Sequence, residues 1–397
     1  MQKLFLNLFF LFVFLAPAGL LAQQNMQQLI DDDMQFAASQ YKTMMQLTPA
    51  TRMPRSFDAA KNELITSDTK WWCSGFYPGT LWLIYGGTKD AAIRQEAEKR
   101  LALLEPEKNF APNHDVGFKM FCSFGTAYAL TKNPAYKDVV FTSAKTLTSR
   151  YRPAIKSIQS WDSSKNFNCP VIIDNMMNLE LLEWVAKNGG DQQYDQIAVN
   201  HANTTLQNHY RPDFSSYHVV DYDLASGKVA RKKTHQGFAD ESAWSRGQAW
   251  GLYGFVVMYR FTKDDRYLQQ ARNIAKFMLQ HPAMPADYIP YWDFNAPATP
   301  TPLRDASAGA VLASALLELA QYSKGSQKSE YIKVAGKIIT TLSSPAYRAP
   351  LGSNGGFLLQ HCVGSLPHNS EVDVPLTYAD YYFMEALTRY RDWVLKK

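Results

Sequence analysis

Two kinds of helical segment alternate along this chain, and the alternation limits the fold more strongly than any other feature. Apolar residues recur at helical spacing over most of the sequence, whereas the period-two alternation of strands is sparse. Segments of the first kind are amphipathic and charged, and they cover 26–46, 90–104, 134–149, 192–208, 264–280 and 328–342. Segments of the second kind are rich in Gly, Ala and aromatic residues, and they start at Ser74, Asp115, Asp174, Glu241, Asp305 and Asp373. The sequence therefore predicts an all-α protein built from pairs of unlike helices.

The segments of the second kind recur at similar intervals. From Asp115 onward their starts are 59, 67, 64 and 68 residues apart, which indicates weak internal repetition with loops of variable length. A helix that is apolar on most sides is buried on most sides. Six such helices, each paired with a charged helix, predict a closed (α/α)6 barrel of six helical hairpins. An open solenoid would also alternate its helices, but the six pairs and the lack of atypical terminal repeats favour closure.

The first residues carry a pattern of their own. Lys3 precedes an apolar run that ends in small residues and Leu-Ala-Gln, which is typical of a secretory signal peptide cut after Ala22. The run is too short and wrongly flanked for a membrane span, and no cysteine follows it to accept a lipid. We therefore expect residues 1–22 to be a signal peptide and residues 23–397 to form a single barrel domain that is exported, to the periplasm.

Charge and cysteine content exclude several classes of function. The net charge of +5 is mildly basic, but no Lys/Arg run marks a nucleic-acid site. The histidines at 114, 209, 218 and 235 lack the short ligand spacing of zinc motifs, so we expect no metal and no other cofactor. Four cysteines lie far apart, and we expect free thiols, with one disulfide left open; they are Cys73, Cys122, Cys169 and Cys362.

Asp174 stands in an otherwise mostly apolar stretch, PVIIDNMMNLELLEW. An ionised carboxylate is costly to bury unless it is paired or hydrogen-bonded. Helix N-capping is the simplest explanation, and Asp115, Asp305 and Asp373 are placed to cap helices in the same way. If the starts of the apolar helices lie together at one end of a barrel, the same geometry also aims these carboxylates into one cleft. Capping and chemistry are therefore compatible explanations.

Further polar residues gather at the same predicted end. His114 adjoins Asp115, and a His-Gln-Gly stretch at 235–237 precedes the helix that carries Arg246 and Trp250. Arg246 and Trp250 are four residues apart and share a helix face. A lone histidine is usually structural, and a lone Arg–Trp pair is usually packing. Two carboxylates together with His, Gln, Arg and Trp at one cleft predict an active site.

Several segments resemble the unsaturated glucuronyl hydrolases of glycoside hydrolase family 88. They are WCSGFYPG, NHDVGF, IIDNMMNLELL, THQG, ESAWSRGQAWGLYGF and DASAGA, and they occur in order from about residue 70 to 390. The resemblance implies an (α/α)6 barrel and a metal-free hydrolase. Such an enzyme removes the 4,5-unsaturated uronic acid from the non-reducing end of oligosaccharides made by polysaccharide lyases.

The resemblance also implies roles for individual residues. Asp174 matches the acid/base and Asp115 its partner carboxylate. The implied substrate-binding residues are His114, His218, Gln236, Arg246, Trp250, Trp161 and Trp72. In relatives the region that matches GSLPHNSEVDVP helps to read sulfate on the next sugar, but a clear Ser-x-Ser-x-Lys pattern is absent here, so no sulfate preference is predicted.

Three other functions remain open at this stage. They are an unsaturated rhamnogalacturonyl hydrolase with the same chemistry, an inverting glycosidase on the same fold, and a sugar-binding protein of the cell envelope. Proton delivery to the substrate requires a protonated carboxyl group, so we expect the pKa of Asp174 to rise well above its usual value when substrate closes the cleft. The sequence indicates neither the parent polysaccharide nor the oligomeric state.

Overall fold

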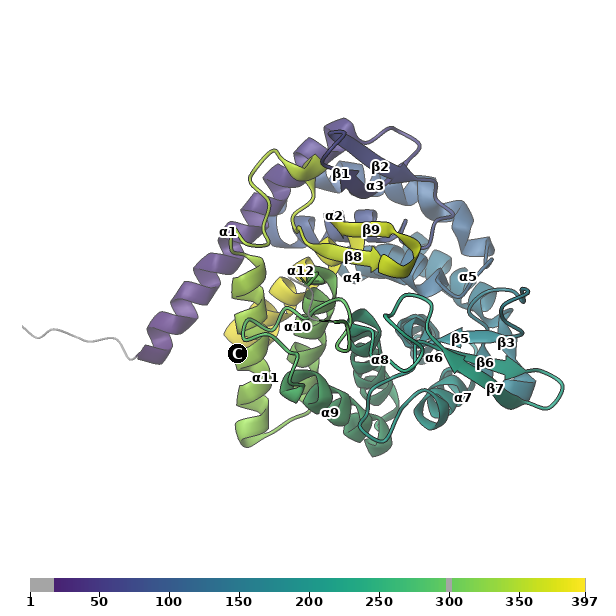
Figure 1. Ribbon diagram of the computed structural model, residues 1–397. Coiled ribbons are helices and arrows are strands. Elements are labelled where there is room, and N and C mark those ends of the chain that lie inside the picture. The colour runs from purple at the N-terminus through teal and green to yellow at the C-terminus, as the bar shows by residue number, and fades with distance from the viewer. Residues whose placement is uncertain (1–17, 298–301, 397) are drawn as a thin grey trace, which may run out of the picture.

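The predicted ring of helical hairpins is confirmed by a computed structural model, which describes residues 18–297 and 302–396 (Figure 1). The outer helices are α1 Ala18–Leu47, α3 Ala91–Leu104, α5 Pro134–Thr148, α7 Gln193–Asn208, α9 Asp265–Gln280 and α11 Gly325–Leu342. The inner helices are α2 Phe76–Thr88, α4 Thr126–Thr131, α6 Leu179–Lys187, α8 Ser245–Thr262, α10 Ala306–Gln321 and α12 Thr377–Tyr390. The fold is therefore an all-α (α/α)6 barrel.

Two of the inner helices are preceded by a helical segment that is not α-helical. The π-helix η2 Gly117–Gly125 precedes α4, and the 3-10 helix η4 Ile173–Asn178 precedes α6. The inner position explains the composition of these helices, because α10 is buried at every residue from Ala306 to Ala320. Small side chains allow its neighbours to approach on all sides. Further short helical elements are η1 Glu105–Asn109, η3 Pro153–Ile155, η5 Asn354–Gly356, η6 Leu366–His368 and η7 Arg391–Leu395.

Tight turns close one end of the barrel, where an inner helix passes to the next outer helix. Three of these turns share the sequence Thr-Lys-(Asp/Asn), at 88–90, 131–133 and 262–264. The lysine adopts a left-handed conformation, with φ of 59° at Lys89, 56° at Lys132 and 59° at Lys263. The following Asp or Asn accepts hydrogen bonds from the first backbone N–H groups of the outer helix, which is ordinary N-capping.

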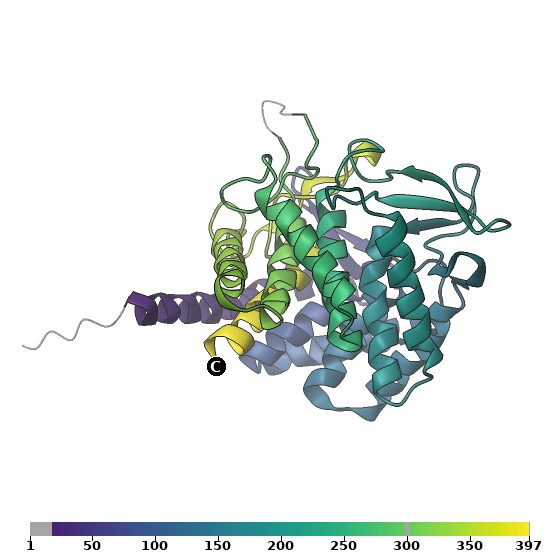
Figure 2. The same ribbon diagram turned by 90° about the horizontal axis from the view of Figure 1, so that it is seen from below.

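Long connections and small sheets occupy the opposite end (Figure 2). The strands form pairs β1–β2, β3–β4 and β8–β9 and a three-stranded sheet β5–β6–β7, all antiparallel. Their bounds are β1 Met53–Asp58, β2 Glu63–Ser67, β3 Tyr151–Arg152, β4 Ser157–Ile158, β5 Pro170–Ile172, β6 Val219–Asp223, β7 Lys228–Lys233, β8 Cys362–Ser365 and β9 Ser370–Val374. The predicted helix start at Asp373 is wrong, because this residue belongs to β9 and α12 begins at Thr377.

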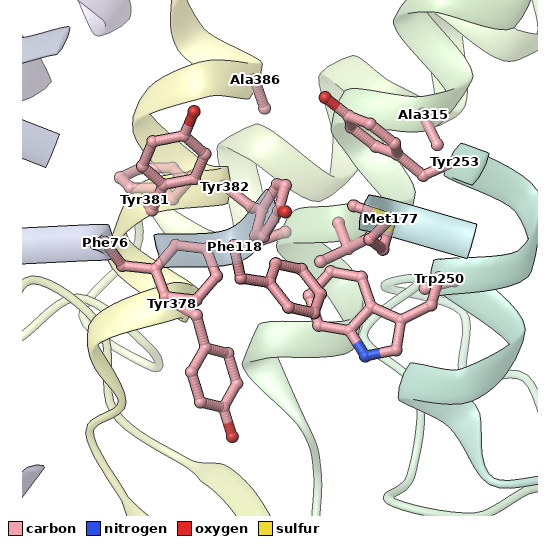
Figure 3. Packing of buried hydrophobic residues seen from close by; sticks show 14 of the residues in the cluster. Phe76, Phe118, Met177, Trp250, Tyr253, Ala315, Tyr378, Tyr381, Tyr382 and Ala386 are labelled. Carbon is pink, nitrogen blue, oxygen red and sulfur yellow. The ribbon is translucent and has the colours of Figure 1, made fainter. Parts of the chain in front are cut away.

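Aromatic side chains fill the centre of the barrel (Figure 3). The ring of Phe118 lies 5.2 Å from that of Trp250, and the Trp250 ring lies 5.2 Å from that of Tyr382. Tilted and edge-on pairs at such distances are favourable contacts. This packed centre separates the end with the sheets from the end with the tight turns.

The N-terminal region carries two predictions, a signal peptide and no membrane-spanning helix. Residues 1–17 of the predicted signal peptide lie outside the described residues, and α1 begins at Ala18. In the described part of the chain, every helix is too short or too polar to cross a membrane.

Candidate active site

Pairing of β5 with β6 brings Asp174 and His218 together. Ile172 pairs with Val219, and the backbone N–H of Ile173 donates to the carbonyl of His218 over 3.0 Å. Asp174 lies two residues after the end of β5 and His218 directly precedes β6, so their side chains meet at the end of the sheet. The His218 Nε2 atom lies 3.4 Å from Asp174 Oδ2.

The orientation of the His218 ring is fixed from its other nitrogen. His218 Nδ1 accepts the backbone N–H groups of His235 and Gln236 over 3.2 and 3.0 Å. A nitrogen that accepts two donors carries no proton, so a neutral His218 carries its proton on Nε2, toward Asp174. The ring also stacks on Trp244 at 4.5 Å. His218 therefore presents an N–H group to the carboxylate.

Asp174 does not cap a helix, which corrects one of the two sequence explanations. The N-cap of η4 is Ile172, and no side-chain capping bond is formed there. Asp174 is 8% exposed, and its Oδ2 atom has no hydrogen-bond partner within the described chain. Burial by itself raises the pKa of this carboxyl group, but His218, His114 and Arg246 outweigh burial and hold the pKa below its usual value. The expected rise in the pKa of Asp174 concerns the cleft closed over substrate, and it stays a prediction.

Asp115 lies at the start of the neighbouring inner segment and shows the opposite pKa shift. It is 8% exposed, and His114 Nε2 lies 3.3 Å from its Oδ1 atom. Burial and the charge of Asp174 raise the pKa of Asp115, against the lowering effect of His114. Asp115 also makes no capping bond, since the N-cap of η2 is Val116. Of the four aspartates predicted to cap, only Asp305 accepts an N-terminal N–H group, from Ser307.

Glycines of α8 allow the segment that carries Asp174 to pack closely against this helix. A Cβ atom on Gly254 would lie 2.4 Å from Met176 Cβ, and one on Gly247 would lie 3.1 Å from Ile173 Cγ2. Any larger residue at 254 would push η4 away from α8. The repeated glycines in SRGQAWGLYG therefore position η4, and with it Asp174.

Arg246 is buried, at 1% exposure, and holds three parts of the site together. Its Nη1 atom donates to Asp305 Oδ2 over 2.7 Å and to the Val363 carbonyl over 2.5 Å, and its Nη2 atom donates to the Gly364 carbonyl over 2.7 Å. The guanidinium also lies over the Trp244 ring. Glu241 and Asp240, which are closer to Arg246 in sequence, bond instead to Arg211.

A cavity of about 350 Å³ joins most of the predicted site residues. Asp174, Asp115, His114, Arg246, Gln236, Trp161 and Trp72 all line it. The other two predicted residues lie behind the wall: His218 backs Asp174, and Trp250 is buried in the central aromatic cluster with its Nε1 atom unpartnered among the described residues. The structure thus gathers the predicted set around one cavity, with two members one layer deeper.

Comparison with known proteins decides the family. Residues 45–395 match Glycosyl Hydrolase Family 88. The chain belongs to this family. It is 46% identical over 349 residues to an unsaturated glucuronyl hydrolase of Formosa agariphila, covering 87% of this chain and 86% of the relative. An enzyme of the same name from Bacillus sp. (strain GL1) is 32% identical over 373 residues, covering 91% of this chain and 96% of the relative.

The fold of a solved structure agrees closely with that of this family 88 chain. An unsaturated glucuronyl hydrolase described as specific for heparin has a TM-score of 0.89 and 42% identity, covering 92% of this chain and 97% of that chain. Family membership makes the protein a glycoside hydrolase.

Sequence reasoning missed several residues of this family 88 cavity. They come from strands, turns, η6 and the start of α12: Arg55, Trp71, Ser365, His368, Ser370, Glu371 and Tyr378. Arg55 pairs with Glu371 over 2.5 Å and lies 4.3 Å from the centroid of the Trp71 ring. The His368 ring lies 4.5 Å from that of His235. The adjacent Trp71 and Trp72 gave a partial signal, since both line the cavity.

The structure describes the four cysteines and the surroundings of the potential metal ligands. The four cysteines are free thiols, and Cys122 alone among them is partly exposed. Within residues 18–297 and 302–396, no group of three or more His, Cys, Asp or Glu side chains is placed to hold a metal ion. The absence of a cofactor from the reaction stays a prediction.

Proposed function

We propose that Asp174 and Asp115 carry out the removal of a 4,5-unsaturated uronic acid from the non-reducing end of oligosaccharides. This activity is the one that family 88 membership and the unsaturated glucuronyl hydrolases among its relatives support. The single observation that carries the assignment is a pair of buried carboxyl groups on one cavity wall whose pKa values are shifted in opposite directions. Such pairs are typical of acid–base sites.

The chemistry follows from the substrate. Its C4=C5 double bond adjoins the ring oxygen, so the reacting group is a vinyl ether. Protonation at C4 leaves an oxocarbenium-like centre at C5, and water then adds at C5 and loses a proton. The resulting hemiketal opens and releases the next sugar. The anomeric centre is not displaced, so the retaining and inverting descriptions do not apply.

The pair of carboxyl groups can hold the proton that this reaction needs. Burial favours a proton on Asp115, while His218 favours an ionised Asp174. Two such groups titrate as a unit. A substrate carboxylate beside Asp174 would add negative charge and exclude water, and both effects raise the pKa of Asp174. We assign proton delivery at C4 to Asp174 and the supporting charge to Asp115.

Cationic and ring-bearing side chains around the pair fit an acidic sugar. Arg246 faces the cavity through a guanidinium that already bonds Asp305 and two carbonyl oxygens, so its position is fixed before substrate arrives. A guanidinium binds a carboxylate strongly. Trp72 and Trp161 offer ring faces on the cavity wall. These contacts support a uronic acid bound next to Asp174.

Turnover of lyase-made disaccharides tests this function. Loss of the alkene's ultraviolet absorbance reports hydration directly, and the panel should include heparin-derived, chondroitin-derived and rhamnogalacturonan-derived substrates. We expect hydration of at least one glycosaminoglycan-derived disaccharide, and a faster rate than on the rhamnogalacturonan-derived one, which carries the same unsaturated ring on a different partner sugar. A chain that hydrates none of them, or that cleaves saturated glycosides at similar rates, would contradict the proposal.

We also propose that the protein is exported to the periplasm after cleavage behind Ala22. The support is the charged start, apolar run and small residues at the N-terminus. N-terminal sequencing of protein from a periplasmic fraction should begin at Gln23. Recovery of the uncut chain from the cytoplasm would contradict export.

A further inference from the structure

A second cavity lies at the end of the barrel with the tight turns, away from Asp174. Its volume is about 440 Å³, within the usual range for ligand sites. It reaches Lys132, which ends α4 in a tight turn, and Asn188, which ends α6. Six aromatic side chains line it: Phe121, Tyr128, Trp184, Tyr253, Tyr381 and Tyr382. We call this space the turn-end cavity.

Two carboxylates give the turn-end cavity fixed acceptor groups. Glu180 is bound by Arg260, and Glu385 accepts from Tyr253 Oη over 3.1 Å and from Ser314 Oγ over 2.5 Å. Neither Arg260 nor Arg389, the two guanidinium groups behind these carboxylates, lines the cavity. The wall thus presents positioned oxygen atoms whose charge is balanced from the far side.

This arrangement discriminates between classes of ligand. An anion would face Glu180 and Glu385, with only Lys132 among the described lining residues to attract it. A cation would gain little, because each carboxylate already has a guanidinium partner. A neutral sugar ring offers apolar faces for the aromatic side chains and hydroxyl donors for the carboxylates, and hydrogen bonds to ionised acceptors are strong. We infer that the turn-end cavity is a binding site for an uncharged sugar.

The two cavities are separate but share structural elements. Gly117 lines the turn-end cavity and lies two residues after Asp115. Met177 lines it as well and lies three residues after Asp174. The uronic acid belongs in the cavity with Arg246, and the uncharged sugar belongs in the cavity with Glu180. The inference therefore adds a ligand beyond the proposed function.

Cys122 provides a direct probe, because it lines the turn-end cavity and the other three cysteines are buried. Burial raises the pKa of this thiol, so labelling by methyl methanethiosulfonate is slow enough to follow by intact mass. We expect cellobiose to slow the labelling, by about tenfold at ten times its Kd, and sodium glucuronate to leave the rate unchanged. The Cys122→Ser variant identifies the labelled site.

A matched pair of variants separates specific binding from a general effect of sugar on protein motion. Ala129 and Leu130 are neighbours on α4 and both are exposed, but only Ala129 lines the cavity. Ala129→Trp should fill the mouth and abolish the saturation-transfer NMR signal of cellobiose. Leu130→Trp, which adds the same side chain outside the cavity, should keep both the signal and the protection of Cys122.

The outcomes are exclusive. Protection by cellobiose and an NMR signal lost only in Ala129→Trp support the site. The inference is overturned if glucuronate protects Cys122 as well as cellobiose does, if both tryptophan variants retain the signal, or if cellobiose at its solubility limit gives neither protection nor signal.

Discussion

Carboxylates are buried at both ends of the barrel, but their partners differ. At the turn end, Glu318 lies between Arg260 and Arg389, with Nη–Oε2 distances of 2.5 and 3.2 Å. At the opposite end, Asp115 and Asp174 have histidines at 3.3 and 3.4 Å, and the nearby guanidinium of Arg246 is bonded to Asp305 instead. Glu318 is thus paired with two permanent cations, whereas Asp115 and Asp174 lie beside imidazole rings.

This difference separates structural from chemical roles. Arginine stays charged at any relevant pH, so Arg260 and Arg389 hold the pKa of Glu318 below its usual value although burial raises it. An imidazole ring is not a permanent cation, and His218 Nδ1 accepts two backbone N–H groups. The two aspartates accordingly have pKa values shifted in opposite directions, whereas the glutamate is held ionised. Substitution of the aspartates should accordingly lower turnover, whereas substitution of Glu318 should lower the free energy of unfolding.

The largest expected effect is the loss of turnover in Asp174→Asn. Asparagine keeps the shape of the side chain but supplies no proton, so kcat should fall by about a hundredfold to ten thousandfold. Stability should fall only modestly, because Asp174 caps no helix, although the variant loses the charge that lies 3.4 Å from His218 Nε2. Absorbance assays and thermal unfolding of the same preparation provide both quantities.

Asp115→Asn is the companion variant for this comparison. It should also lower kcat, since the charge of the partner is lost, and it should leave substrate binding measurable. Wild-type turnover by Asp174→Asn would contradict the assignment of Asp174 as the proton donor.

Glu318→Gln should produce the opposite pattern. The change removes the shared anion between Arg260 and Arg389, and breaking a buried ion pair costs about 3–5 kcal/mol of unfolding free energy. Turnover per folded molecule should stay near the wild-type value. Glu330→Gln on the exposed face of α11 is the matched control, with an expected change within about 0.5 kcal/mol. Denaturant titration with an activity assay on the folded fraction checks both statements.

Arg246→Lys should affect both turnover and unfolding free energy, because Arg246 lines the cavity and also forms a buried ion pair with Asp305. Lysine cannot make the planar contacts to Asp305 and the β8 carbonyls. We expect a loss of about 1.5–3 kcal/mol of stability and a fall in kcat/KM of about tenfold or more. Asp305→Asn isolates the ion pair, since asparagine caps a helix about as well as aspartate. Normal kcat/KM in Arg246→Lys would reduce Arg246 to a structural role.

Local patterns in the sequence predict the ring of helices, but not the geometry of the end that carries the small sheets and the cavity with Asp174. Helical spacing is a local property, so the alternation of 134–149 with the apolar segments could be recognised without tertiary information. A further local signal marks three hairpin turns but is not part of the sequence prediction above. It is Thr-Lys-(Asp/Asn), at 88–90, 131–133 and 262–264. A motif search for helix C-terminal and N-cap residues would find it.

The contacts that define the site join distant residues. Ile172 pairs with Val219, and Arg246 bonds Asp305, across 47 and 59 positions of the chain. No spacing rule gives such contacts, so the bond from Arg246 to Asp305 could not be predicted from nearby sequence. Capping by Asp174 was wrong for a related reason: η4 is a 3-10 turn that follows β5 directly, and its start is set by the sheet. Resemblance to the family supplied most of the cavity residues, and local patterns alone would not have done so.

A third kind of buried carboxyl group sharpens the comparison, because Glu183 on α6 forms no ion pair with any residue that the structure describes. Both of its oxygen atoms are buried without a hydrogen-bond partner in the described chain. Burial and the charge of Asp195 raise the pKa of Glu183 to about 8, against the lowering effect of Lys187, which is itself bonded to Asp195 over 2.9 Å. The folded protein therefore retains this proton where the unfolded chain, with an ordinary value of 4.5, has lost it.

Glu183→Gln should consequently change the pH dependence of stability and leave turnover near normal. A raised pKa in the folded state means that stability falls as the pH rises from about 4.5 to about 8, because the unfolded state alone gains from ionisation. Glutamine removes this proton linkage, so the variant should match the wild type near pH 4.5 and exceed it by about 4 kcal/mol at pH 8. Denaturant titrations at both pH values measure the difference. An equal offset at both values would show that Glu183 does not titrate in this window, and that burial without a cation is tolerated here for another reason.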